Sequence, residues 1–172
     1  GKGTLVTRVR ERRSNLGLTV SATTRAPRKG EVDGVNYFFL TREEFDRRVA
    51  NGEFVEWAEV HGNCYGTLVS EVQSKLASGS SLILEIDVQG ALQVKERFPE
   101  AVLIFIKPPS LEVLRERLVG RGTETPETIE LRMANAALEL ALADRYDDVV
   151  VNDDLDRATD ELVRVLDMHE RI

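Results

Sequence analysis

Apolar residues recur along the chain at two spacings, one typical of helices and the other typical of strands. Leu111, Leu114 and Leu118 lie three and four residues apart, which places them on one stripe of a helix. Residues 54–60 alternate between apolar and polar side chains, as in a half-buried strand. Residues 102–106 are apolar throughout, as in a buried parallel strand. This alternation of strands and helices predicts an α/β fold, with a parallel or mixed sheet wrapped by helices.

Capping residues, prolines and glycines set the predicted ends of these elements. Thr41 and Glu44 form a capping box at the start of one helix. Ser110 caps a second helix, and Thr125 precedes a proline at the first position of a third. The polar segment 22–34 contains proline and glycine and is predicted to be a loop. We predict helices over residues 3–13, 42–51, 68–77, 89–98, 110–120, from 126 onward and over 155–170, and strands over residues 18–21, 37–40, 54–60, 81–87, 102–106 and 149–151.

The composition is that of an ordinary globular protein. The 172 residues are 42% hydrophobic and 31% charged, and no repeat or composition break separates two linked domains. We therefore expect one domain over residues 1–172, with any subdomains inserted between strands of one sheet. A single cysteine, Cys64, excludes an intrachain disulfide and favours a reducing, cytoplasmic setting. No apolar run approaches the ~20 residues that span a bilayer, so we expect no membrane partner.

Charge is unevenly distributed. The net charge is −7, yet residues 1–30 carry eight Lys and Arg and one acidic residue. An acidic chain argues against general nucleic-acid binding, which usually needs a basic domain. A basic end instead suits a small ligand that carries phosphate. Four of these cations, Arg8, Arg10, Arg12 and Arg13, are predicted to form a solvated helix face.

The first residues resemble the second half of a P-loop. Gly1-Lys2-Gly3-Thr4 leads directly into a predicted helix, and the P-loop pattern ends in Gly-Lys-Ser/Thr. In that motif backbone N–H groups cradle phosphates and the lysine reaches the β and γ oxygens. Gly3 stands where Ser or Thr is expected, so Thr4 is the predicted hydroxyl for Mg²⁺. Read alone, four residues at a chain end also fit a flexible terminus.

Motifs along the rest of the chain resemble those of guanylate kinases, in the order that this family has them. They cover residues 21–28, 30–34, 37, 54–57, 62–67, 85–90, 108–110, 117–124, 132 and 151–154. The resemblance implies a P-loop kinase core that transfers the γ-phosphoryl group of ATP to GMP with Mg²⁺, giving ADP and GDP. It also implies two insertions, a GMP-binding part over residues 20–71 and a lid over residues 110–140.

The resemblance assigns the guanine base to a group of carboxylates and hydroxyls. Guanine presents N1–H and an amino group side by side, and a carboxylate accepts from both. Glu56 is the implied acceptor, although its place between Val55 and Trp57 would by spacing alone predict an exposed strand residue. The other implied residues are Ser21, Thr67, Glu85 and Asp87. The family usually has Asp at the position of Glu85, which makes the role of Glu85 less defined than that of Asp87.

The resemblance assigns the phosphates to arginines, tyrosines and the chain start. Two guanidinium groups and two phenols suit a dianionic phosphate. The residues implied for the GMP phosphate are Arg25, Arg28, Tyr37 and Tyr65. The implied catalytic residues are Lys2, Arg117, Arg121 and Arg132. The residues implied for ATP are Gly1, Lys2, Gly3, Thr4, Asn152 and Asp153. Arginines that arrive on a closing lid supply charge and exclude water. No general base is needed, because the acceptor phosphate is already largely ionised at neutral pH.

Other functions remain open from the sequence. Some scaffold proteins carry a guanylate-kinase-like domain that binds peptides and turns over no nucleotide. Such domains depart from the phosphate-site pattern, whereas the six implied phosphate-site cations are present here. A kinase for AMP or UMP, or a related kinase for a sugar phosphate, would share the first four residues. The carboxylates at positions 56, 85 and 87 argue for guanine instead.

Overall fold

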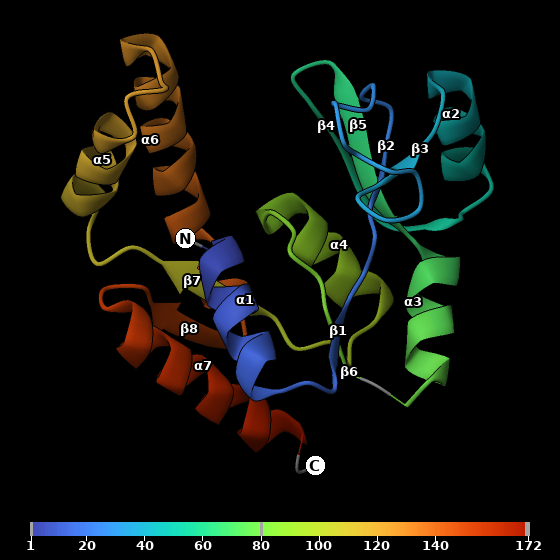
Figure 1. Ribbon diagram of the computed structural model, residues 1–172. Helices are drawn as coiled ribbons and strands as arrows, with labels where there is room; N and C mark the ends of the chain where they lie inside the picture. The colour runs from blue at the N-terminus through green and yellow to red at the C-terminus, as the bar shows by residue number, and fades with distance from the viewer. Residues whose placement is uncertain (1, 80, 171–172) are drawn as a thin grey trace. The chain divides into compact units, whose positions relative to one another are not determined.

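The computed structural model describes residues 2–79 and 81–170 (Figure 1). The chain divides into two compact units. We call residues 13–101 the central unit, and residues 1–12 with 102–172 the terminal unit. Among the described residues, no helix is both long enough and apolar enough to cross a membrane.

The central unit contains a four-stranded sheet and a separate parallel pair. The sheet has the order β3-β2-β5-β4, in which only β2 and β3 are parallel. Its strands are β2 (Ala22–Thr23), β3 (Phe38–Phe39), β4 (Phe54–Val60) and β5 (Asn63–Leu68). The parallel pair is β1 (Leu16–Leu18) with β6 (Ser81–Ile83), in which Leu16 lies opposite Ser81.

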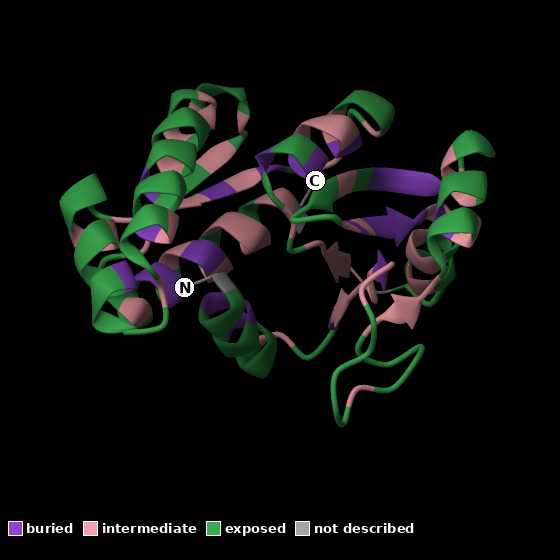
Figure 2. Ribbon diagram, turned by 90° about the horizontal axis from the view of Figure 1, so that it is seen from above, coloured by how far each residue is buried: buried purple, intermediate pink, exposed green. Residues whose placement is uncertain are grey.

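The described residues of the central unit form three helices, two of which begin at a side-chain cap. They are α2 (Arg42–Ala50), α3 (Val69–Ala77) and α4 (Val88–Arg97). The capping box of Thr41 and Glu44 is present at α2, which confirms the prediction made from their spacing. A core of Ala22, Phe45, Phe54, Cys64 and Leu68 lies between the four-stranded sheet and α2. Figure 2 shows that the loop between β2 and β3 is largely exposed.

The terminal unit pairs β7 (Ile104–Lys107) in parallel with β8 (Asp148–Val151). Its helices are α1 (Lys2–Arg12), α5 (Leu111–Gly120), α6 (Pro126–Ala141), the short 3₁₀ turn η1 (Ala143–Arg145) and α7 (Leu155–Glu170). Leu5 and Val9, four residues apart, are fully buried on α1, which packs against α7. A second core joins α5 and α6 through Leu118, Ile129 and Met133. The cap predicted at Ser110 is present, and α6 begins as predicted, with Pro126 in its first turn after Thr125, which caps it.

The predicted strands overlap observed ones, but several of their bounds were wrong. Residues 19–21 are not strand, and the predicted loop 22–34 begins with β2. β6 ends at Ile83, so Glu85 and Asp87 follow it in a loop that leads into α4. β5 was not predicted at all, because Asn63–Leu68 has no regular alternation and contains Gly66. A Cβ on Gly66 would lie 2.7 Å from Phe54 Cδ1 and 2.8 Å from the Glu56 carbonyl oxygen, which explains the glycine.

Candidate functional site

A buried carboxylate lies at the centre of the first group of predicted residues. Glu56 on β4 is only 6% exposed, and Thr67 on β5 is fully buried. The Thr67 hydroxyl donates a hydrogen bond to Glu56 Oε1 at 2.8 Å. Burial of a charged group costs free energy unless hydrogen-bond partners compensate. The Thr67 hydroxyl is such a partner for the Glu56 carboxylate.

The β4–β5 hairpin brings these two side chains together. Its two turn residues, His61 and Gly62, both have positive φ, as in the two-residue turns that match strand twist. Counting back from this turn, the register places Glu56 opposite Thr67. A bulge between Phe54 and Glu56 interrupts the alternation of β4. The expectation from spacing alone that Glu56 is exposed was therefore wrong, because Phe54, Val55 and Glu56 are buried in succession.

Helix α4 closes over the same carboxylate. A Cβ on Gly90 would lie 2.6 Å from Glu56 Oε2, so only glycine leaves space for the carboxylate in this position. Asp87 caps α4 by accepting a hydrogen bond from the Gly90 N–H at 2.9 Å. Gln93 exchanges two hydrogen bonds of 3.1 Å with the backbone of Trp57, next to Glu56. These contacts fix the helix against β4.

The environment of Glu56 raises the pKa of its carboxyl group. Burial is the largest cause, and the negative charge of Asp87 acts in the same direction. The hydrogen bond from Thr67 opposes the shift. Glu56 is therefore a carboxylate whose ionised form gains from any additional hydrogen-bond donor.

A second group of predicted residues lies on the loop between β2 and β3 and on β5. Arg25 is paired with Glu31, and its guanidinium carbon lies 5.1 Å from the centre of the Tyr37 ring. The Tyr37 and Tyr65 rings are in edge contact, with centroids 6.3 Å apart. Arg28 is exposed. The structure thus brings Arg25, Tyr37 and Tyr65 together.

Two further predicted residues flank this unit's strands. Ser21 is partly buried, and its carbonyl oxygen accepts a hydrogen bond from the Phe38 N–H at 2.9 Å. Glu85 is exposed, in the segment between β6 and α4. Neither side chain is as enclosed as Glu56 or Thr67.

The residues of the predicted P-loop begin the terminal unit. α1 starts at Lys2, and Gly3 and Thr4 are exposed in its first turn. The Gly3 carbonyl oxygen accepts a hydrogen bond from the Thr7 hydroxyl at 3.0 Å. Gly1 and the Lys2 side chain lie outside the described structure. The helix start agrees with the predicted beginning at residue 3.

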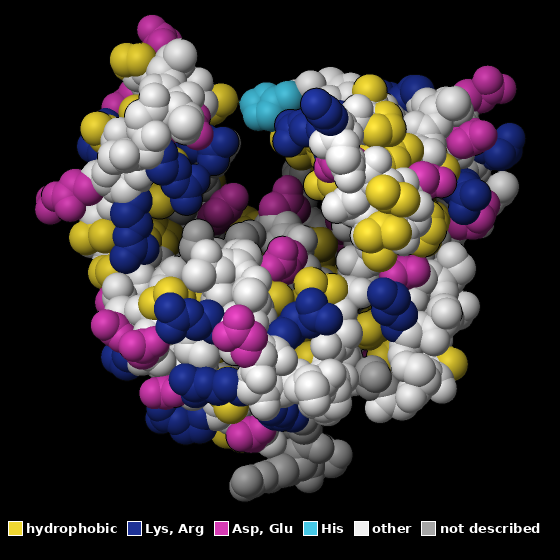
Figure 3. All heavy atoms as spheres, in the orientation of Figure 1, with side chains coloured by type: hydrophobic (Ala, Val, Ile, Leu, Met, Phe, Trp, Pro, Cys, Tyr) yellow, Lys and Arg dark blue, Asp and Glu magenta, His cyan; other side chains and the backbone are white. Residues whose placement is uncertain are grey.

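Exposed arginines gather on α5 and α6, over which Figure 3 shows a group of basic side chains. Arg117 donates to the Asn152 carbonyl oxygen at 3.1 Å, which connects α5 with the loop after β8. Arg132 pairs with Glu124 at 3.3 Å, and Arg121 is exposed just after α5. The terminal unit therefore holds all three arginines predicted for the lid.

The loop after β8 is fixed by a residue that the sequence reasoning missed. Arg157 on α7 pairs with Asp153 at 2.7 Å and donates to the Val151 carbonyl oxygen at 2.6 Å. The hydrogen bonds from the Asp154 N–H and from Arg157 lower the pKa of Asp153. The four-residue spacing of Asp153 and Arg157 was the available signal. Gly90 and Gln93 were also missed, because they contact a strand that is distant in the sequence. Glu31 was missed because its contacts with Arg25 and Arg28 depend on how an irregular loop closes.

Comparison with known proteins gives a consistent result over almost the whole chain. A family model described as Guanylate kinase matches residues 2–169. The guanylate kinase of Gloeobacter violaceus is 56% identical over 166 residues, which cover 96% of this chain and 81% of that protein. The guanylate kinase of Halalkalibacterium halodurans is 53% identical, with the same coverage. The crystal structure of guanylate kinase from Anaplasma phagocytophilum matches with a TM-score of 0.75 and 39% identity, over 96% of this chain and 80% of that one.

Proposed function

The chain belongs to the guanylate kinase family, and from this premise we propose how its residues divide the work of the reaction. The reaction is transfer of a phosphoryl group from ATP to GMP, which gives ADP and GDP. The central unit holds every residue proposed for GMP, and the terminal unit every residue proposed for ATP and catalysis. We assign residues 20–71 to GMP binding and residues 110–140 to a lid.

The buried pair of Glu56 and Thr67 is the observation that carries the proposed guanine site. An ionised carboxylate only accepts hydrogen bonds, and guanine offers two adjacent donors at N1 and N2. Adenine offers no such pair, so with AMP the buried carboxylate would keep only its hydrogen bond from Thr67, at a high cost. Ser21, Glu85 and Asp87 are proposed to complete recognition of the base. The longer side chain of Glu85 and its exposure suit a contact made through water.

The proposed clamp for the GMP phosphate consists of Arg25, Arg28, Tyr37 and Tyr65. Arginine presents several N–H donors in a planar fork that matches phosphate oxygens. The ring contacts that join Arg25, Tyr37 and Tyr65 support this assignment, because they place a cation and two phenols in one neighbourhood. The acceptor phosphate needs positioning rather than proton removal.

The proposed catalytic cations are Lys2, Arg117, Arg121 and Arg132. Phosphoryl transfer depends mainly on alignment and on neutralising the charge that is spread over the transferring group. Exposed arginines on a lid can supply that charge and exclude water when the lid closes, which suppresses hydrolysis of ATP. Gly1, Gly3 and Thr4 would cradle the ATP phosphates, and Asn152 and Asp153 would lie beside adenine.

We also propose that Mg²⁺ enters with ATP. The ion usually keeps several waters and binds substrate phosphates with one or two protein oxygens. The described residues contain no group of three or more His, Cys, Asp or Glu that would hold a metal by themselves. The exposed Thr4 hydroxyl in the first turn of α1 fits the role of a single protein ligand. When bound, the ion neutralises charge on the β and γ oxygens.

A coupled ADP-release assay tests this function directly. The protein is supplied with ATP and Mg²⁺ and with GMP, AMP or UMP as the acceptor. Rapid turnover with GMP alone is expected, since only guanine satisfies Glu56. Equal turnover with AMP would contradict the proposed guanine site. Binding of GMP without turnover of any acceptor would instead favour a peptide-binding relative that has lost catalysis.

A further inference from the structure

A shielded ion pair organises the loop between β2 and β3. Arg25 Nη1 and Nη2 each donate to one oxygen of Glu31, both at 3.0 Å. The two side chains are only 13% and 18% exposed, whereas in the ion pairs of Arg42 and Arg48 in the same unit every side chain is 35% exposed or more. Two parallel hydrogen bonds between a guanidinium and a carboxylate fix the geometry of both groups.

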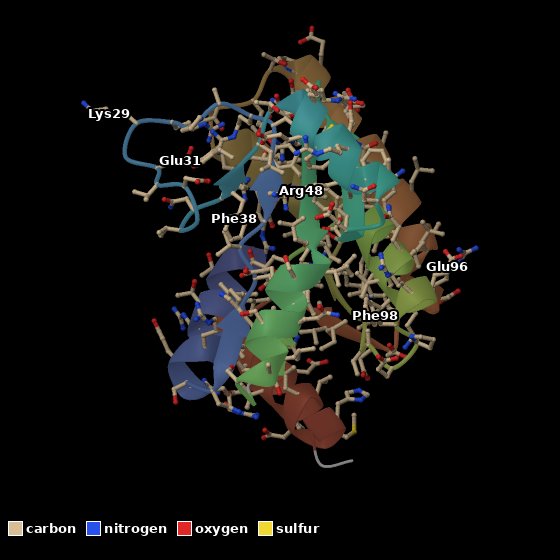
Figure 4. The ribbon with its side chains drawn as sticks, turned by 90° about the vertical axis from the view of Figure 1, so that its right-hand side faces the viewer. Lys29, Glu31, Phe38, Arg48, Glu96 and Phe98 are labelled. Atoms are coloured by element: carbon tan, nitrogen blue, oxygen red, sulfur yellow. The ribbon has the colours of Figure 1, made fainter. Side chains whose placement is uncertain are left out.

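The same carboxylate also holds the backbone of the second proposed phosphate ligand. Glu31 Oε1 accepts a hydrogen bond from the Arg28 N–H at 2.7 Å. Figure 4 shows Glu31 inside the curve of this loop and Lys29 pointing outward. One side chain therefore connects Arg25 and Arg28 across an otherwise exposed segment. Both contacts lower the pKa of Glu31, so it stays ionised at neutral pH.

Glu31 and Ala26 together use only part of the hydrogen-bonding capacity of the Arg25 guanidinium. Arginine has five N–H donors. Glu31 uses one from each terminal nitrogen, and the Ala26 carbonyl oxygen accepts from Nη1 at 3.0 Å. The Nε–H and the second N–H of Nη2 are used by neither residue, and the guanidinium also interacts with the Tyr37 hydroxyl, itself a proposed ligand of the phosphate. These two donors point outward from the same edge of the planar guanidinium, so together they can bind two oxygens of a phosphate.

We propose that Glu31 is a positioning residue for GMP binding, which aligns Arg25 and Arg28 without contacting the nucleotide. The inference rests on the proposed phosphate roles of those two arginines. The phosphate need not displace Glu31. Glu31 binds the edge of the guanidinium formed by Nη1 and Nη2, whereas the phosphate would bind the edge formed by Nε and Nη2. The effect of Glu31 is therefore on the phosphate of GMP and not on the base.

Glu31→Gln tests the proposal, because it keeps the size of the side chain and removes its charge and one acceptor. We expect the KM for GMP to rise about tenfold, in line with the loss of one charged hydrogen bond. kcat should change less. The inhibition constant of guanosine, a competitor that lacks the phosphate, should not change. Glu96→Gln is the matched control, since Glu96 is an exposed carboxylate on α4 of the same unit (Figure 4).

Three outcomes would overturn the proposal. An unchanged KM would show that Glu31 positions nothing, and a lower KM would make it a competitor of the phosphate. Equal weakening of GMP and guanosine would mean a general effect on the fold of the unit.

Arg25→Gln separates this inference from the proposed function. If that variant binds GMP normally, the phosphate role of Arg25 is wrong. If it raises the KM for GMP while Glu31→Gln does not, only the positioning role fails. In the Arg25→Gln background, the effect of Glu31→Gln should shrink, since its main partner is gone.

Discussion

The Thr67 hydroxyl donates a 2.8 Å hydrogen bond to the buried Glu56 carboxylate, and the register of one hairpin sets this contact. The bond uses Oε1, while Gly90 leaves space beside Oε2. The carboxylate is thus held by the protein in one place before any nucleotide binds. In this arrangement the acceptor for guanine needs little reorganisation on binding.

Glu56→Gln should raise the KM for GMP by about 10- to 100-fold, with a smaller effect on kcat. The amide replaces an acceptor with a donor that faces the donors of guanine. The coupled ADP-release assay measures both constants, with Glu59→Gln as the control, because Glu59 is exposed on the same strand. A KM equal to that of the parent would show that guanine is recognised elsewhere.

The raised pKa of Glu56 also predicts how stability depends on pH. Below the usual value of 4.5 the group is protonated in both folded and unfolded chains. As pH rises above this value the unfolded chain loses the proton first, so the folded state binds more protons and its stability falls. Glu56→Gln removes this contribution. The free energy of unfolding of the parent, measured in urea without nucleotide, should therefore decline relative to the variant between pH 4.5 and neutral pH. A constant difference over this range would contradict the assigned shift.

The sequence predictions succeeded where contacts within one helical turn determine the structure. They failed where the pairing of strands or the closure of a loop determines it. The capping box at Thr41 and the cap at Ser110 are contacts within one helical turn, so the sequence was sufficient to place α2 and α5. Burial of Glu56 depends on a bulge and on a strand, β5, that shows no alternation. The pairing of Arg25 with Glu31 depends on how a loop closes. These features could not be read from local spacing.

The P-loop residues give a prediction of a different kind, since a lysine there acts on charge that develops during transfer. Lys2→Ala should lower kcat about 100-fold or more, with a much smaller effect on the KM for GMP. The position belongs to the terminal unit, whereas the proposed GMP residues are all in the central unit. Steady-state kinetics with both substrates varied would test this, and kcat equal to that of the parent would contradict the P-loop assignment.

Gly90 offers a test of whether the position of the Glu56 carboxylate, and not only its charge, determines guanine binding. Gly90→Ala places a methyl group 2.6 Å from Glu56 Oε2, which is too close for two atoms that are not bonded. The carboxylate, which lies between Thr67 and α4, must therefore move. We expect the KM for GMP to rise at least several-fold while the far-UV circular dichroism stays that of the parent. Gly120→Ala is the control for glycine replacement in a helix, because beyond its chain neighbours and the backbone of its own helix no described atom would lie within 4 Å of the added Cβ. If Gly90→Ala binds GMP as the parent does, a displaced carboxylate still serves, and the close packing of α4 against Glu56 has no part in recognition.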